Sequence, residues 1–99
     1  MIRRLVLDVL KPHNPSKIQL SEKLSKLKGI AGVNILTIEI DKNVENVKIV
    51  LEGRSINFKK IEKIIEDSGG AIHSIDEVAA GKKLIEEVNT PQDKAVWLR

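Results

Sequence analysis

The stretch that decides the fold is VKIVLEGRSINFKKIEKIIEDSGGAIHSIDEV, residues Val47–Val78. It holds an alternating apolar segment, an amphipathic segment that starts at Asn57, the pair Gly69-Gly70 and a second alternating segment. Alternation with a period of two predicts strands, and apolar residues spaced three and four apart predict a helix. Glycine after the last apolar position is typical of a helix end. The stretch therefore predicts strand, helix, strand.

The first half of the chain has the same order of features. The alternating segment Arg3–Leu10 precedes an amphipathic segment at Ser16–Lys28, Gly29 follows it, and Val33–Asp41 alternates again. Two such halves, joined by a short turn at Asp41–Glu45, make a β-α-β-β-α-β chain, which is the split-βαβ or ferredoxin-like arrangement. We therefore expect an α+β ferredoxin-like sandwich, in which an antiparallel four-stranded sheet of order 4-1-3-2 has both helices on one face.

The domain is expected to end near residue 88. Residues 1–88 would form one ferredoxin-like domain, with a short helix at 81–88, and residues 89–99 would form a C-terminal tail. This tail holds the apolar residues Val96 and Trp97, which are unusual in a free polar terminus. We expect it to dock on a neighbouring subunit, and a frayed end is the alternative.

Two starts compete for the first helix. Asn14 can cap a helix that has Pro15 at its first position, because proline is favoured there. Alternatively, Ser16 and Gln19 have the spacing of a capping box, in which each side chain accepts a hydrogen bond from the other residue's backbone. The sequence leaves both starts open.

Alternation also predicts which side chains face the helices. The first strand should turn Leu5 and Val9 inward, and the second strand should turn Leu36, Ile38 and Ile40 inward. The opposite face carries no helix, and apolar side chains should mix there with charged ones. The expected set is Val6, Leu10, Ile35 and Val50 with Arg4, Asp8, Glu39, Lys48 and Glu52.

The first and third strands are expected to lie side by side and parallel. Arg4 would then neighbour Lys48, and Asp8 would neighbour Glu52. Like charges side by side are destabilising. A partner chain or a bound ion would compensate the repulsion between them. The alternative is that the long side chains point apart into water.

Composition sets the broad class of the protein. With 99 residues and 41% hydrophobic content, one compact domain is expected. No apolar run approaches the roughly 18 residues of a membrane span, and the start of the chain lacks the features of a secretory signal. We therefore expect a cytoplasmic protein. Abundant Lys, Glu and Ile, with no cysteine, favour a thermophilic source and exclude disulfides and thiol catalysis.

Charge argues against nucleic acid as a partner, and the lack of a long apolar run argues against a membrane. The net charge is +3, but both signs are interspersed and no basic block is present. RNA binding through a sheet needs aromatic residues on the central strands, and the predicted strands have none. The C-x-x-C of heavy-metal carriers and the glycine-rich anion loop of acylphosphatase-like enzymes are also missing. The expected partner is therefore a second copy of the chain.

An acidic set makes a candidate metal site. Its members are Asp8, Glu52, Asp76 and Glu77, with Ser74 nearby. Ligand sets made of oxygen atoms alone suit a hard cation such as Ca²⁺ or Mg²⁺. Solvated or interfacial charges are the alternative. If Ile75 faces inward, Glu77 does so too, and a bulge or an early strand end must then relieve the last strand.

The loop before the first helix makes a second candidate site. Lys11, His13 and Asn14 precede a helix N-terminus, where free N–H groups and the helix dipole favour an anion or a small ligand. The alternative is that His13 is a simple exposed loop residue. No spacing in the chain indicates a catalytic triad or dyad, so we assign no catalytic residue.

Three stretches carry a family resemblance. They are RRLVLDVLKPH at Arg3–His13, GVNI at Gly32–Ile35 and IHSIDEV at Ile72–Val78. The chain resembles, from about Arg3 to Asp93, a small archaeal family known as domain of unknown function family 211. The resemblance implies a ferredoxin-like fold, ring-like homo-oligomers and, for some relatives, calcium binding, but no established activity. The residues that match its motif positions are Asp8, Lys11, His13, Ser74, Asp76 and Glu77.

We therefore expect a non-enzymatic homo-oligomeric domain that binds a hard cation or a small ligand at its subunit interfaces. A ligand-sensing regulatory module, with its pocket near Lys11–Asn14, is the alternative. An enzyme that uses Asp8, His13 or His73 as acid or base is less well supported by the sequence.

Overall fold

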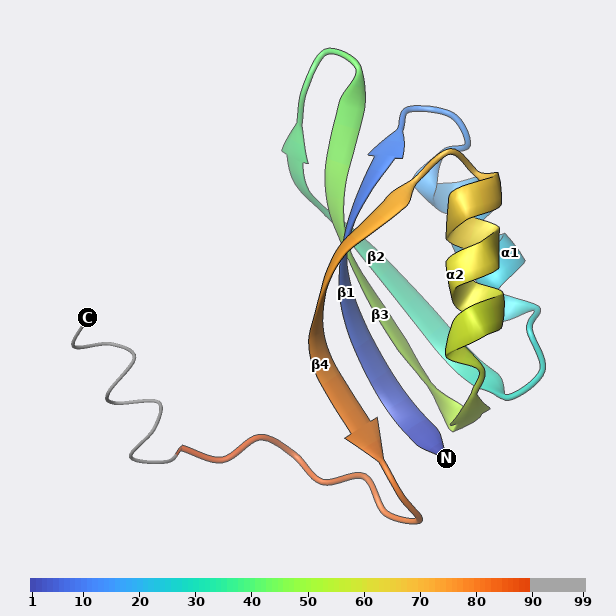
Figure 1. Ribbon diagram of the computed structural model, residues 1–99, viewed down its shortest axis with the longest axis vertical. Helices are drawn as coiled ribbons and strands as arrows, with labels where there is room; N and C mark the ends of the chain where they lie inside the picture. The colour runs from blue at the N-terminus through green and yellow to red at the C-terminus, as the bar shows by residue number, and fades with distance from the viewer. Residues whose placement is uncertain (90–99) are drawn as a thin grey trace.

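The computed structural model describes residues 1–89 and has the expected order of elements (Figure 1). The elements are β1 (Ile2–Pro12), α1 (Lys17–Ser25), β2 (Ile30–Ile40), β3 (Val44–Ile56), α2 (Phe58–Asp67) and β4 (Ala71–Ala80). The strands form one four-stranded sheet of order β2-β3-β1-β4, and both helices lie on the same face of it. The ferredoxin-like α+β fold is therefore confirmed.

The core lies between the sheet and the two helices. Alternate residues of β1 and β3 meet the apolar stripes of α1 and α2, as the period of each element requires. The fully buried side chains are Leu5, Leu7, Val9, Val47, Ile49 and Leu51 from the strands, with Leu20, Leu24, Ile61 and Ile65 from the helices.

The first helix begins with the capping box. Ser16 accepts a hydrogen bond from the backbone N–H of Gln19, whose side chain accepts one from the backbone N–H of Ser16. The start at Asn14 is therefore not used. The helix ends at Ser25, earlier than the apolar pattern predicts, and the chain reaches Gly29, whose φ of 91° is in the left-handed region.

Strands β1 and β3 are antiparallel, so the expectation that they run parallel is wrong. Arg4 lies opposite Glu52, and Asp8 lies opposite Lys48. β3 is antiparallel to both β1 and β2. The reason is that α1 carries the chain back to the end of the sheet where β1 began, so that β2 runs in the direction of β1 before the β2–β3 hairpin reverses the chain. Opposite charges therefore face each other across this pair, and the predicted clash of like charges does not arise.

As far as Thr37, the faces of β2 are also the reverse of those expected, and the register shift before Glu39 then places Glu39 and Ile40 on the faces expected for them. Ile35 lies opposite the buried Ile49 and packs against the core, whereas Leu36 lies opposite Lys48 and is 51% exposed. Ile38 and Ile40 are exposed as well. The sequence fits either assignment because apolar residues are adjacent at 35 and 36, and the cross-strand register decides between them.

The last strand has the predicted irregularity. The β1–β4 register shifts between Val6 and Leu7 and again between Asp8 and Val9. Asp76 and His73 are the extra residues on β4 at these two bulges. The first bulge lets Glu77 lie opposite Val6 while Ile75 lies opposite Leu7.

The segment after β4 is not helical, so the short helix expected at 81–88 is wrong. Gly81 has a φ of 117° and donates its N–H to the carbonyl of Met1. Arg3 then donates to the carbonyl of Lys82 at 2.8 Å. These contacts turn the chain at the end of the sheet, and Glu86 then reaches Arg4 on the face without helices. The predicted docking of Val96 and Trp97 lies outside the described residues.

Within residues 1–89, no helix is long and apolar enough to cross a membrane.

Candidate functional site: the open face of the sheet

One face of the sheet carries no helix, and we call it the open face (Figure 1). Side chains from three strands are apolar and accessible there: Leu10 is 41% exposed, Leu36 is 51% exposed and Val44 is 39% exposed. Val6 and Val50 lie opposite each other, one step beyond the pair Asp8 and Lys48, and are half-buried. These five side chains form an apolar band across β1, β2 and β3, which the pair Asp8 and Lys48 interrupts.

Arg4 forms ion pairs with several glutamates at one end of the open face. Its Nε lies 2.7 Å from an oxygen of Glu52, and its Nη1 lies 2.8 Å from an oxygen of Glu86 in the segment after β4. Glu77 is farther away, at 3.8 Å. The hydrogen bonds to Glu86 and Glu52 raise the pKa of Arg4. The hydrogen bond between Arg4 and Glu86 lowers the pKa of Glu86. Glu52 and Glu77 are therefore directed towards Arg4.

Asp8 and Asp76 lie in the middle of the open face. The side chain of Asn46 donates to the Asp8 carboxylate. Ser74 lies opposite Asp8 on β4, and its hydroxyl donates to Asp76 at 2.6 Å. Of the four carboxylates predicted as a cation site, two therefore lie near Arg4, and the other two accept hydrogen bonds from Asn46 and Ser74. In residues 1–89, no group of three or more His, Cys, Asp or Glu side chains comes close enough to hold a metal ion.

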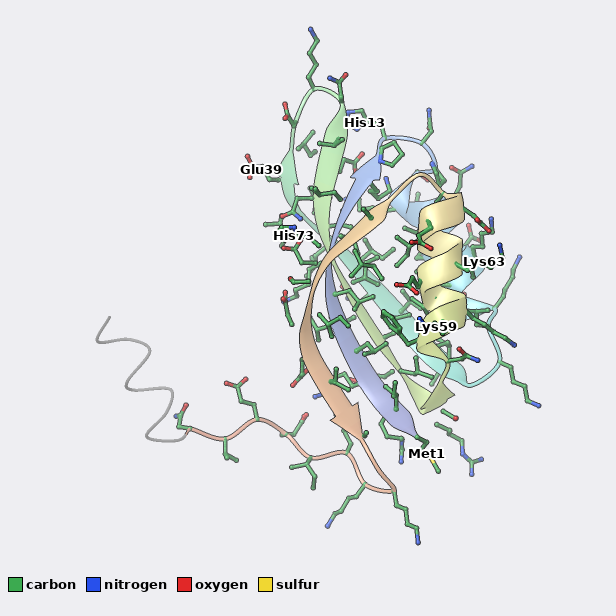
Figure 2. The ribbon with its side chains drawn as sticks, in the orientation of Figure 1. Met1, His13, Glu39, Lys59, Lys63 and His73 are labelled. Atoms are coloured by element: carbon green, nitrogen blue, oxygen red, sulfur yellow. The ribbon has the colours of Figure 1, made fainter. Side chains whose placement is uncertain are left out.

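Another carboxylate, that of Glu39, lies at the upper end of the open face. It lines a depression of about 270 Å³ together with Asp8, Leu10, Asn46 and His73. Figure 2 shows Glu39 and His73 on the side of the molecule away from the lysines of α2. The open face thus mixes apolar side chains with charged ones along its length.

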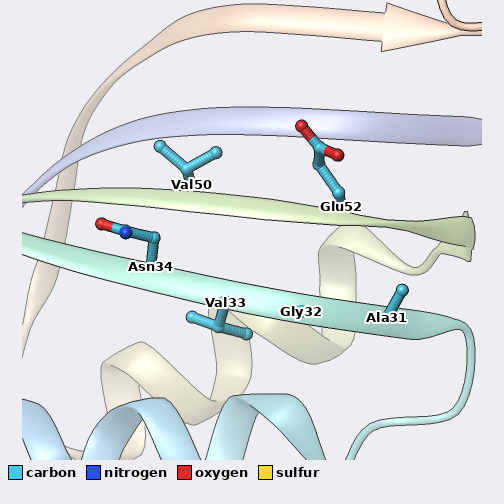
Figure 3. A pocket seen from close by; sticks show the side chains of 6 residues that line it. All are labelled: Ala31, Gly32, Val33, Asn34, Val50 and Glu52. Atoms are coloured by element: carbon cyan, nitrogen blue, oxygen red, sulfur yellow. The ribbon is translucent and has the colours of Figure 1, made fainter.

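A shallow depression of about 400 Å³ lies beside β2 and β3 (Figure 3). Its lining includes Gly32, Asn34, Val50 and Glu52. A β-carbon at position 32 would meet nothing within 4 Å. The glycine therefore leaves a hollow in the open face that a side chain from another molecule can enter.

The predicted ligand loop is occupied by the chain itself. Lys11 is only 2% exposed, and its Nζ donates to the carbonyl of Pro12 and lies 3.6 Å from Glu45. His13 contacts the other oxygen of Glu45 at 2.8 Å. Asn14 is exposed in the loop. The two cationic side chains predicted to meet an anion thus face a carboxylate of β3.

Glu45 was missed as a site residue, although the sequence holds a signal for it. Lys11 and Glu45 extend the buried odd-numbered stripes of β1 and β3, and they lie opposite each other in the register. A charged residue on a buried stripe needs a partner of opposite charge. Leu36 was missed because it was assigned to the wrong face of β2.

Comparison with known proteins gives two matches. The model of domain of unknown function family 211, described as "Uncharacterized ArCR", matches residues 3–94. The archaeal "Uncharacterized protein MJ0319" of Methanocaldococcus jannaschii is 59% identical over 93 residues, which cover 94% of this chain and 96% of the relative. Both matches agree with the resemblance found in the sequence.

Proposed function

The chain belongs to domain of unknown function family 211, and from its open face we propose that it is a non-enzymatic module that assembles with copies of itself. The observation that carries the proposal is the apolar band across β1, β2 and β3. Leu10, Leu36 and Val44 lie exposed together on a face without a helix. Exposed apolar surface beside charged groups, on a face that no helix covers, is typical of association sites.

Charge complementarity supports a second copy as the occupant. Lys48 and Arg4 share the open face with Asp8, Glu39 and Asp76, so the face offers both signs around its apolar band. Two copies related by a twofold axis can place each patch against its opposite. The hollow at Gly32 leaves room for a side chain of the other copy.

We include a hard cation in this proposal. Asp8 and Asp76 flank Ser74 and offer carboxylate and hydroxyl oxygens, which Ca²⁺ and Mg²⁺ prefer. One chain brings too few acidic ligands together, so a cation here takes the remaining oxygens from the second copy. Cation binding and assembly are then coupled.

Light scattering tests the assembly. At micromolar concentration we expect a mass that is a multiple of the 11.0 kDa of one chain. Burial of an apolar face favours association because it removes that face from water. A mass of one chain, with and without added calcium, would contradict the proposal.

Calcium should raise the melting temperature, because a ligand that binds only the folded state stabilises it. At a concentration about 100-fold above its dissociation constant we expect a rise of roughly 10 °C for a domain of this size. Asp76→Asn should abolish the rise, whereas Glu66→Gln on α2 should leave it unchanged. Equal melting temperatures with calcium and with chelator would count against the cation but not against assembly.

We favour assembly over a ligand-sensing module. The pocket of such a module was expected near Lys11–Asn14, and the charged side chains of that loop contact Glu45 instead.

A further inference from the structure

The His13 side chain joins two loops at the upper end of the molecule (Figure 2). It lies in the connection between β1 and α1. Its Nδ1 is 2.8 Å from a carboxylate oxygen of Glu45 near the start of β3, and its Nε2 is 3.0 Å from the backbone carbonyl of Lys42 in the hairpin turn. The imidazole therefore bridges the β1–α1 loop and the β2–β3 hairpin with one contact from each ring nitrogen.

Both partners of this ring accept hydrogen bonds and cannot donate them. A carbonyl oxygen has no proton, and neither has an ionised carboxylate. A neutral imidazole has only one N–H, so it can satisfy one of the two acceptors while its other nitrogen turns a lone pair towards the second. Only the imidazolium, which donates from both nitrogens, makes both contacts at once.

We infer that His13 is a pH-operated latch: the protonated ring ties the β2–β3 hairpin turn to the loop after β1, and loss of its proton releases one of the two ties. The His13 side chain is 44% exposed, so solvent protons reach it. Glu45 is only 13% exposed, which strengthens its attraction for the imidazolium.

The charges around the ring come from three elements. Lys11 of β1 lies 3.6 Å from the second oxygen of Glu45, so one carboxylate serves two cationic groups. In the hairpin turn, the Asp41 carboxylate accepts from the backbone N–H of Lys42. Lys11 also donates to the carbonyl of Pro12. Because the Lys11 ammonium lies beside Glu45, this carboxylate keeps a cationic neighbour when His13 is neutral. The Lys11 ammonium thus holds the Glu45 carboxylate in place whether the His13 imidazole is protonated or neutral.

The protonation equilibria agree with this geometry. The hydrogen bond to Glu45, and then that to the Lys42 carbonyl, raise the pKa of His13 above its ordinary 6.5. The latch therefore contributes its full stability below pH 6.5 and loses it as the pH rises through the raised value. The contact with His13, and then Lys11, lower the pKa of Glu45 below its ordinary 4.5, so its contribution is complete above pH 4.5 and is lost as the pH falls through the lowered value.

Nuclear magnetic resonance of the unmodified chain tests the latch. The ring nitrogens of the two histidines can be followed through a pH titration, and the variant His73→Gln assigns the remaining signal to His13. We expect His13 to titrate above 6.5 and to carry protons on both nitrogens at lower pH. A midpoint at or below 6.5 would overturn the inference.

Amide hydrogen exchange gives the second readout. The backbone N–H of Asp41 bonds to the carbonyl of Val44 across the hairpin turn, and that of Ser68 bonds to Ile64 at the end of α2. Between about pH 5.5 and about pH 8.5 the protection factor of Asp41, corrected for intrinsic exchange, should fall while that of Ser68 stays constant. In His13→Gln the fall should vanish. If Asp41 shows the same pH dependence in the variant, the latch does not exist.

Discussion

Gly53→Ala is expected to lower the free energy of unfolding by about 3 kcal/mol, at the upper end of the cost of overpacking a close contact. Gly32→Ala, one strand away, is expected to leave it unchanged or to raise it by about 0.4–1 kcal/mol, because alanine reduces the freedom of the unfolded chain. The two substitutions are chemically identical. Their opposite effects follow only from what surrounds each glycine.

Gly53 lies where β3 passes the connection between α1 and β2. A β-carbon at position 53 would overlap the carbonyl oxygen of Gly29 and come within 2.9 Å of the Cα of Ile30. Both obstacles are backbone atoms, so no side-chain rotation relieves them. Arg3 also donates to the carbonyl of Gly53 at 3.0 Å, which ties this point to β1. The sheet must therefore deform to accept the methyl group.

Urea unfolding at one fixed protein concentration measures both variants, since association makes apparent stability depend on concentration. The midpoint should shift downward for Gly53→Ala without a change of slope. Equal midpoints for the two variants would show that β3 and the α1–β2 connection do not approach as closely as described.

Local signals in the sequence were sufficient to predict the order of the elements. Leu5, Leu7 and Val9 alternate on β1 and are all fully buried. Ser16 and Asn57 cap the helices that follow them, as their hydrogen bonds to the third helical residue show. Each of these signals depends on residues within one element, so a single sequence is enough to find it.

The faces of β2 and the pairing of charges depend on cross-strand contacts, and these proved harder to predict. Ile35 and Leu36 are both apolar, so the alternation along β2 is compatible with either residue facing the core. The register with β3 decides between them. The error in the direction of β1 relative to β3 had another origin. The sheet was already expected to be antiparallel, which excludes a parallel pairing of these strands, and the observed register then places Arg4 opposite Glu52.

In the candidate site, too, local features were predicted and features that depend on contacts between strands were not. Ser74 was predicted near the acidic set and lies opposite Asp8 in the register. One bulge of β4 leaves Asp76 without a partner on β1, whereas Glu77 lies opposite Val6, and Arg4 attracts Glu77 and Glu52 to one end of the face. Which carboxylates gather is thus decided by a cation on another strand, and no spacing within β4 reveals it.

Leu36→Arg is expected to turn the assembly into single chains. Leu36 is 51% exposed on the open face and lies opposite Lys48, so the substitution leaves the core of one chain intact. In an assembly through this face the guanidinium would lose water beside a second copy and another cation. A cost of about 3 kcal/mol for burying an unpaired polar group weakens each contact more than about 100-fold.

Ile18→Arg is the matched control. Ile18 is 71% exposed on α1, on the opposite side of the sheet, so the same change of charge and size occurs away from the open face. Light scattering of both variants should give the mass of one chain for Leu36→Arg and an unchanged multiple for Ile18→Arg. Circular dichroism should show both variants folded. If Leu36→Arg keeps the parent mass, copies meet through another surface; if both variants dissociate, added positive charge and not the open face is responsible. Because the two variants carry the same net charge, only the position of the arginine on the fold can separate their masses.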